Sequence, residues 1–322
     1  MISNPPPLLA IVVPCYNEEE VLQTTIYTLD KKLATLIQEK KIHSDSFLCF
    51  VDDGSADKTW DLLIEHLHKR NIAIKLSKNF GHQNALLAGL QEVVNRCDCC
   101  ISIDGDLQQD EDKIDEFIKK YTDGAEIVLG IRRDRNTDGL FKKLTAYLFY
   151  SIMSLMGAKT LRNHADYRLM GRRSIEALLR FGEKNLFLRG LIFELGFSIA
   201  TVDFDVRERF AGKSKYSISK MFSFAWNGIA STSVVPLRVV GFVGILVCVI
   251  SLCLGVYALF TSIFLKTNIP GWASTVIPMY FLGGIQLFSL GIIGEYIGKI
   301  YTETKNRPRY IIEERFFNEQ KD

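Results

Sequence analysis

The stretch LLAIVVPCYNEEE, residues 8–20, begins as an unbroken apolar run and becomes polar immediately after Pro14. An apolar run of this length that ends in a polar turn is typical of a strand buried on both faces of a parallel sheet. Residues 19–39 then repeat apolar side chains every three or four positions, which predicts a helix. The segment therefore forms one strand–loop–helix unit, with its polar residues in the loop.

The same plan recurs along the chain, in SFLCFVDDGSADKTWDLLIEHL, IAIKLSKNFGHQNALLAGLQEVV and CCISIDGDLQQ, and AEIVLGIRR supplies a further strand. We expect Ser55 or Asp57 to cap the helix after VDDGS. Strands that alternate with helices predict an α/β fold with a mostly parallel sheet flanked by helices. Because ligands bind at the carboxyl ends of such strands, the polar turns are expected to meet in one crevice.

The turn inside SIDGDLQQ, residues 102–109, fits two interpretations. Asp104, Gly105 and Asp106 have the composition of an ordinary strand-ending turn. Two carboxylates and the amide oxygen of Gln108 are also the hard ligands that Mg²⁺ or Mn²⁺ prefers. The convergence of several polar turns favours the metal. The GxGxxG and GxxxxGK[ST] motifs are absent, so we expect a divalent ion on Asp106 and its neighbours to neutralise a nucleotide diphosphate and make it a good leaving group.

Composition and charge give no support for nucleic-acid binding, a disulfide framework, a zinc site or a secretory signal. The chain has 322 residues, a formal net charge of +2 and no block of like charge, which gives no case for nucleic-acid binding. Its seven cysteines form no regular framework, which indicates reduced thiols. The CDCC cluster at residues 97–100 lacks a second Cys/His pair at zinc-finger spacing, so it predicts no zinc site. The first residues lack the basic and long apolar regions of a secretory signal.

Two long uncharged runs, residues 239–265 and 272–293, lie near the other end of the chain. Each exceeds the roughly 20 residues that a helix needs to cross a bilayer. With the short loop between them, they predict a two-helix transmembrane hairpin. Both runs are free of charge, and Glu295 lies near the end of the second. One charge at this position is too little for an ion path, which argues against a transporter component.

Basic residues flank the predicted hairpin but are scarce in its loop. Only Lys266 lies in the loop, whereas the flanks hold Arg238, Lys299, Lys305, Arg307 and Arg309. The positive-inside rule then places both flanks in the cytosol. We expect a cytosolic domain over residues 1–230, two transmembrane helices over 231–302 and a cytosolic tail over 303–322. A homo-oligomer is compatible with so small a membrane footprint.

The motifs PCYNEEE, VDDGSADKT, NFGHQNALLAG, DGDLQQ and GIRR, in this order and spacing, resemble those of the family 2 glycosyltransferases, which are inverting enzymes with the GT-A fold. HADYRLM, RERFAGKSKYS and the C-terminal hairpin resemble the polyprenyl-phosphate glycosyltransferases, which include dolichol-phosphate mannose synthase and the bactoprenol glucosyltransferases. The resemblance covers residues 8–309. The motif QxxRW, usual in processive polysaccharide synthases, is absent.

The resemblance implies metal-dependent transfer of a hexose from a nucleotide sugar to polyprenyl (undecaprenyl) phosphate, at the cytosolic leaflet of a bacterial plasma membrane. The layout of the bactoprenol enzymes favours UDP-glucose, with GDP-mannose and UDP-GlcNAc as alternative donors. The expected partners are the nucleotide sugar, the lipid phosphate and the bilayer, and the expected cofactor is Mg²⁺ or Mn²⁺.

The resemblance also implies roles for individual residues. Those expected to bind the nucleotide sugar are Pro14, Tyr16, Glu18, Val51, Asp53, Asp104, Gly105 and Arg132, with Arg133 as an alternative to Arg132. The expected metal ligands are Asp106, Gln108 and Asp104. The expected phosphate-binding residues, for donor, acceptor or both, are Arg209, Lys215 and Ser214. The expected catalytic residues are Asp166 and Asp106.

Asp166 matches the proposed base of the family, but its role is open. The acceptor is a phosphate monoester with a second pKa of about 6, so it is largely ionised near neutral pH. It therefore needs a general base less than a sugar hydroxyl does. Asp166 is expected either to orient the acceptor or to take its residual proton.

Three segments near the membrane keep alternative interpretations. The basic run over residues 207–220 is either a phosphate-binding loop or a generic contact with anionic headgroups. Residues 221–233 are amphipathic and predict an interfacial helix. Residues 140–157 predict either a second interfacial helix or a helix that packs on the sheet.

Overall fold

The computed structural model describes residues 5–68, 70–133, 164–183, 188–206, 235–260 and 272–317. These residues fall into two compact units. The first contains the described residues up to 206 together with 307–317, and the second contains residues 235–260 and 272–306. The C-terminal tail therefore belongs to the same unit as the N-terminal domain.

The first unit is built on one eight-stranded sheet with the order β7-β5-β6-β4-β1-β2-β3-β8. Its strands are β1 (Leu9–Cys15), β2 (Phe47–Asp52), β3 (Ile72–Leu76), β4 (Cys99–Ser102), β5 (Ile127–Arg132), β6 (His164–Gly171), β7 (Ile199–Phe204) and β8 (Ile312–Phe317). Strands β4, β1, β2 and β3 are parallel. β6 is antiparallel to β4 and β5, and β8 is antiparallel to β3. The predicted α/β sheet is confirmed, with a parallel centre inside a mixed sheet.

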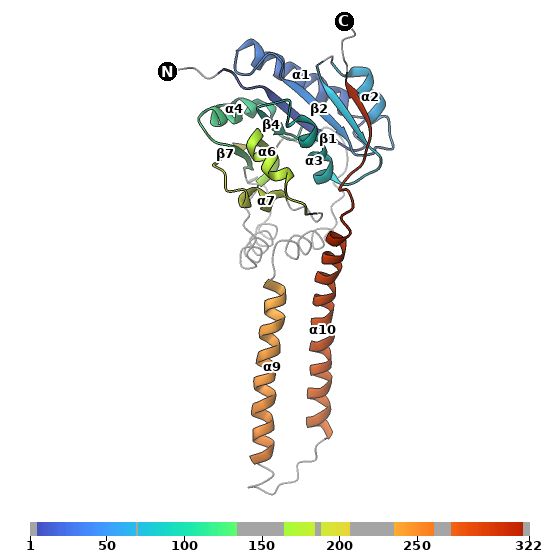
Figure 1. Ribbon diagram of the computed structural model, residues 1–322, viewed down its shortest axis with the longest axis vertical. Helices are drawn as coiled ribbons and strands as arrows, with labels where there is room; N and C mark the ends of the chain where they lie inside the picture. The colour runs from blue at the N-terminus through green and yellow to red at the C-terminus, as the bar shows by residue number, and fades with distance from the viewer. Residues whose placement is uncertain are drawn as a thin grey trace. The chain divides into compact units, whose positions relative to one another are not determined.

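Helices cover both faces of this sheet (Figure 1). One core holds side chains of α1 (Leu22–Gln38), α2 (Thr59–His66) and α4 (Ile114–Thr122), and the other those of α3 (His82–Val93), α6 (Arg172–Leu179) and α7 (Leu188–Glu194). Alternate residues of β1 enter the two cores, with Ile11 in the first and Val12 in the second. A strand buried on both faces needs an unbroken apolar run, which explains the sequence LAIVVPC.

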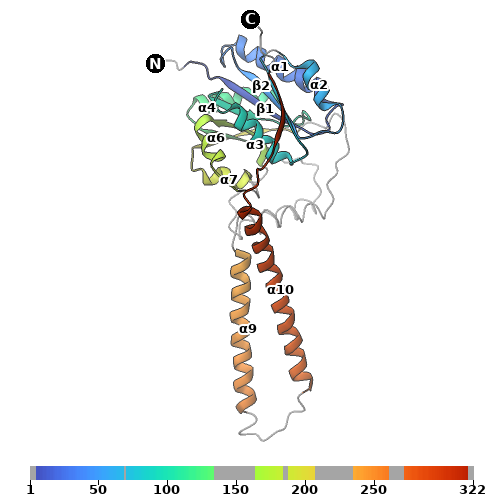
Figure 2. The ribbon, with the colours of Figure 1, turned by 45° about the vertical axis from the view of Figure 1, so that its right-hand side comes forward.

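The tail contains a strand that the sequence pattern did not indicate. β8 pairs with β3 and places Phe317 opposite Ile72 (Figure 2, dark red strand). The Arg96 guanidinium lies 4.7 Å from the centre of the Phe317 ring. Arg315 Nε donates to Glu92 Oε2 at 3.1 Å. Since Glu92 and Arg96 lie on or just after α3, these contacts attach the tail to that helix.

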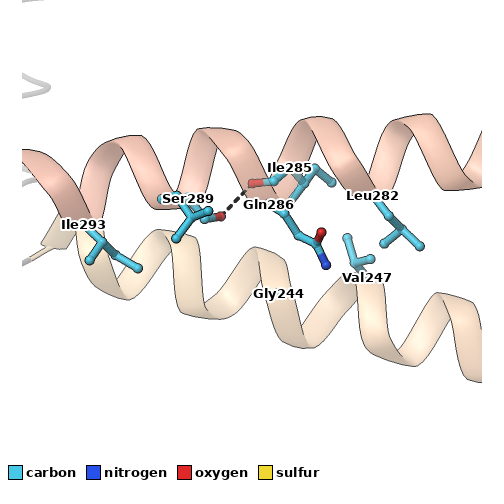
Figure 3. A pocket seen from close by; sticks show the side chains of 8 residues that line it. Gly244, Val247, Leu282, Ile285, Gln286, Ser289 and Ile293 are labelled. Carbon is cyan, nitrogen blue, oxygen red and sulfur yellow. Dashed lines mark hydrogen bonds between the residues drawn. The ribbon is translucent and has the colours of Figure 1, made fainter.

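The second unit contains α9 (Val235–Phe260) and α10 (Trp272–Thr304), of 26 and 33 residues. An apolar groove of about 520 Å³ lies between them (Figure 3), lined by Gly244, Val247, Leu282, Ile285, Gln286, Ser289, Leu290 and Ile293. Among the helical stretches with described side chains, Phe281–Thr304 is long and apolar enough to cross a membrane, and Leu237–Val247 is shorter. Both predicted C-terminal helices are present, and α10 has a membrane-spanning length.

Candidate active site

The loops that follow β1 and β2 are hydrogen-bonded to each other at the carboxyl ends of these adjacent strands. Asp53 N donates to Cys15 O at 2.9 Å, and Asn17 N donates to Ser55 Oγ at 2.9 Å. Asn17 Oδ1 in turn accepts from Ala56 N at 2.9 Å. The first two polar turns therefore meet, as the positions of their strands predict.

The residues expected around the nucleotide differ in accessibility. Pro14 and Val51 are partners in the register of β1 and β2 and are buried, so they form the floor of this edge. Tyr16 is 45% exposed and is the large aromatic side chain of this loop. Glu18 is half-buried, and its backbone N donates to Thr59 Oγ1 at 3.0 Å. Of these four residues, Tyr16 is the most exposed.

The helix after VDDGS begins differently from the prediction. Its N-cap is Lys58, not Ser55 or Asp57. Asp57 still receives a local hydrogen bond, because its Oδ1 accepts from Thr59 N at 3.0 Å. Ser55 is instead used to hold Asn17, as described above. The expected N-cap position was therefore wrong by one residue for Asp57, which still binds the first helical N–H, and Ser55 bonds to the neighbouring loop instead.

Asp53, which is expected to bind the nucleotide, is held by the backbone of the next strand–helix unit. Its side chain is buried, with Oδ1 accepting from Phe80 N at 2.8 Å and Oδ2 from Gly81 N at 2.9 Å. Burial raises the pKa of Asp53, and these two hydrogen bonds oppose the rise. Gly54 has a φ of 66°, and a Cβ there would lie 2.4 Å from the carbonyl carbon of Lys78. The VDDGS turn therefore holds the loop that precedes α3.

The SIDGDLQQ turn is held by Gln109, a residue of the motif for which the sequence predicted no role. Gln109 is buried, and its Nε2 donates to Asp104 Oδ2 at 2.5 Å while its Oε1 accepts from Asp104 N at 3.1 Å. Gly105 O accepts from Thr25 Oγ1 at 2.7 Å. Asp106 Oδ1 accepts from Gln108 N at 3.1 Å. Asp104 is thus fixed in position, and Asp106 is half-buried at the edge of the turn.

Three side chains from different elements converge beside this turn. His82, the first residue of α3, has its Nε2 3.6 Å from Asp104 Oδ1 and 3.9 Å from Asp166 Oδ2. Asp166 lies on β6, which Ser102 ties to β4 by donating to Asp166 O at 2.6 Å. Burial raises the pKa of Asp104; His82 opposes this rise, and the charges of Asp166 and Asp106 add to it. A cation beside these carboxylates would relieve that cost.

Asp166 is held by two arginines that the sequence pattern did not indicate. Arg168 Nη2 donates to Asp166 Oδ1 at 2.7 Å, and Arg189 Nη2, from α7, donates to Oδ2 at 3.0 Å. Burial opposes ionisation of Asp166, but the two guanidiniums outweigh it and hold the pKa of that carboxyl well below its usual range. A carboxylate of lowered pKa is a weak proton acceptor.

Comparison with known proteins identifies the family. Residues 10–179, more than half of the chain, match the model of glycosyl transferase family 2. The chain is a family 2 glycosyltransferase. Residues 235–300 match the GtrB C-terminal hairpin. The predicted resemblance is confirmed over both parts of the chain.

Relatives align with this glycosyltransferase over nearly its whole length. The glycosyltransferase YkoT of Bacillus subtilis (strain 168) is 51% identical over 316 residues, 98% of this chain and 94% of the relative. The bactoprenol glucosyl transferase of Shigella phage SfX is 36% identical over 310 residues, 95% of this chain and 99% of the relative. A prophage bactoprenol glucosyl transferase homolog of Escherichia coli (strain K12) is 35% identical over 307 residues, 94% and 98% of the two chains.

The neighbouring side chains of Arg132 and Arg133 differ in their surroundings. Arg132, at the end of β5, is exposed, and its charge lowers the pKa of Asp104. Arg133 Nη1 instead pairs with Asp205 Oδ2 at 3.7 Å. Of the two, Arg132 is the one whose charge acts on Asp104.

The phosphate-binding residues expected in the basic run, Arg209, Ser214 and Lys215, lie outside the described residues, as do the amphipathic segments 140–157 and 221–233. The cysteines of the CDCC cluster are buried free thiols in the cores of the first unit.

Proposed function

We propose that this enzyme transfers glucose from UDP-glucose to polyprenyl phosphate, at the cytosolic leaflet of a bacterial plasma membrane. The observation that carries the proposal is that bactoprenol glucosyl transferases align over nearly the whole of both chains, and the C-terminal hairpin matches as well. A soluble sugar donor and a lipid acceptor must meet at a membrane surface, which explains a glycosyltransferase domain joined to apolar helices.

In the proposed reaction, a phosphate oxygen of the acceptor attacks the anomeric carbon as the bond from that carbon to the nucleotide diphosphate breaks. The attack comes from the side opposite the leaving group, so the configuration at this carbon inverts. Asp166, held ionised by Arg168 and Arg189, orients the acceptor phosphate for its attack. Arg132 stabilises negative charge near Asp104.

The acidic turn fits a divalent ion of the kind that shares its coordination with substrate. The described residues contain no group of three or more His, Cys, Asp or Glu side chains arranged to hold a metal alone. Mg²⁺ is usually bound by one or two carboxylates together with substrate phosphates, and Asp104 and Asp106 supply such a pair. Gln108 contributes its backbone N to the same turn. When bound, the ion would neutralise the leaving diphosphate.

Both α9 and α10 are proposed to cross the membrane, with their flanks in the cytosol. The uncharged runs of the sequence and the basic residues on either side of them support this topology. The hairpin matched by residues 235–300 supports it as well.

A panel of donors tests the proposed reaction. Purified full-length enzyme in detergent is given polyprenyl phosphate with UDP-glucose, GDP-mannose or UDP-GlcNAc in turn, and the released nucleotide is measured. We expect the fastest turnover with UDP-glucose. Faster turnover with another donor would correct the sugar, and no acceptor-dependent turnover with any of the three would refute the lipid-phosphate acceptor.

Metal dependence is tested at Asp106. We expect Asp106→Asn to lower the transfer rate about 100-fold or more, because an amide is a far weaker ligand of a divalent ion than a carboxylate. EDTA should do the same to the wild type. Asp110→Asn is the matched control, since Asp110 lies on the same segment and caps the short helical turn Glu111–Lys113 through Asp112 N. Full activity of Asp106→Asn would show that the motif is an ordinary turn.

A further inference from the structure

The cluster around Asp166 brings two guanidiniums to one carboxylate. Arg168 binds one oxygen of Asp166, and Arg189 approaches both, with Nη2 3.0 Å from Oδ2 and Nε 3.5 Å from Oδ1. Both guanidiniums therefore hold the Asp166 side chain in place. His164, on the same strand, adds no charge near neutral pH, because burial and the two arginines lower its pKa to about 3.

The two arginines differ in their access to a ligand. Arg168 has a side chain that is 3% exposed, and its Nη1 is buried with no hydrogen-bond partner among the residues that the structure describes. A buried guanidinium nitrogen in this state favours an anion close by. Arg189 has a side chain that is 31% exposed. A ligand in the crevice can therefore reach Arg189, while Arg168 supports Asp166 from the interior.

This cluster lies next to the acidic turn, on the other side of one histidine. Asp104 and Asp166 flank the imidazole of His82, whose Nε2 lies 3.6 Å from the first and 3.9 Å from the second. The Asp104 side of His82 belongs to the turn assigned above to the donor diphosphate. The Asp166 side carries the arginines, which suit a second anionic group.

We propose that Arg189 binds a phosphate of the substrates, with Asp166 orienting its guanidinium and Arg168 holding Asp166 from the buried side. A guanidinium fork matches two oxygens of a phosphate, a geometry that lysine cannot reproduce. The inference rests on the proposed function in one respect, namely that the substrates are a nucleotide diphosphate sugar and a lipid phosphate. Because the Asp104 side takes the diphosphate, we expect the acceptor monoester at Arg189.

Steady-state kinetics of the full-length enzyme in detergent test the proposal, with a short-chain isoprenyl phosphate as acceptor. We expect Arg189→Ala to raise the KM for the acceptor about 10- to 100-fold, the usual effect of losing a charged hydrogen bond. Arg189→Lys should lie between this variant and the wild type. Arg173→Ala is the matched control, since Arg173, on α6, also donates to a carboxylate, Glu126 Oε2 at 2.9 Å. It should leave both KM values within about twofold of the wild type.

The pattern of KM values identifies the phosphate. An increase for the isoprenyl phosphate alone supports the acceptor, and an increase for the nucleotide sugar alone supports the donor diphosphate. Unchanged KM values for both substrates in Arg189→Ala would overturn the proposal, as would a fall in kcat alone, which indicates a structural role. Thermal unfolding of each variant shows whether it is folded, and Arg189→Lys, which keeps the charge, provides the same test if the alanine variant is unfolded.

A binding measurement separates this inference from the proposed function. The short-chain isoprenyl phosphate is added without any sugar donor, and the rise in the melting temperature is measured. Stabilisation of the wild type that is lost in Arg189→Ala but kept in Arg173→Ala supports phosphate binding at Arg189, even if no donor in the panel is turned over. Equal stabilisation of all three proteins, or of none, counts against it.

Discussion

At the scale of the residue, Asp166 is better suited to orient the acceptor than to accept its proton. Arg168 and Arg189 keep its pKa lowered, so it stays ionised while the acceptor phosphate, with a second pKa of about 6, gains its proton. We therefore expect kcat/KM to fall below about pH 6 because the acceptor, not Asp166, is protonated.

A more basic acceptor tests this origin of the pH dependence. An isoprenyl phosphonate is compared with the phosphate over pH 5 to 8, which spans that pKa on both sides. The acid limb of the profile should move to higher pH with the phosphonate. If the acid limb lies at the same pH with both acceptors, the group that titrates belongs to the enzyme and not to the acceptor.

The sequence motifs contain the acidic residues expected at the site, but they did not predict the residues that hydrogen-bond to these carboxylates and hold them in position. Asp104 and Asp106 follow β4, so their position at the carboxyl end of the sheet follows from the parallel strands, whereas Asp166 lies on antiparallel β6. Gln109 and Arg189 could not be assigned in this way, because their roles depend on contacts that form only in the folded chain. Asp53 illustrates the same limit, since its partners Phe80 and Gly81 come from the next strand–helix unit.

At the scale of the element, the parallel centre of the sheet was predictable and its edges were not. β1 to β4 have buried apolar runs followed by polar turns, a pattern typical of parallel α/β units. β6 pairs antiparallel with β4 and β5, and β8 pairs antiparallel with β3. Both positions depend on pairing between segments that are far apart in the sequence. β8 has half-buried or exposed side chains, so its sequence has little of the apolar signal of a central strand.

Removal of β8 should destabilise the first unit. A chain that ends at residue 306 leaves the edge of β3 unpaired and loses the half-buried contacts of Ile312, Phe316 and Phe317. We expect a loss of about 2 kcal/mol or more in the free energy of unfolding, together with aggregation through the exposed strand. A chain that ends at residue 317 keeps β8 and serves as the control. Urea unfolding of both chains, with light scattering, measures the effect, and equal stability would show that β8 contributes nothing.

At the scale of the whole molecule, a glycosyltransferase domain with reduced, buried cysteines is followed by two long apolar helices. The length of α10 suits a bilayer, and the basic residues lie outside the apolar runs. These features together support the proposed hairpin, whose two ends are expected in the cytosol and whose predicted loop, residues 266–271, is expected on the far side.

Single cysteines in the loop and after α10 test this topology in intact cells. Asn268→Cys places a thiol in the loop, and Thr304→Cys places one at the exposed end of α10. A membrane-impermeant maleimide should label the first from outside and label the second only after the cells are permeabilised, because both flanks follow the positive-inside rule. The wild type measures the background from its own seven cysteines. Labelling of Thr304→Cys in intact cells, with or without labelling of Asn268→Cys, would contradict a cytosolic tail. A tail outside the cell could not pair with β3 of a cytosolic domain, so this result would also contradict the pairing of β8 with β3.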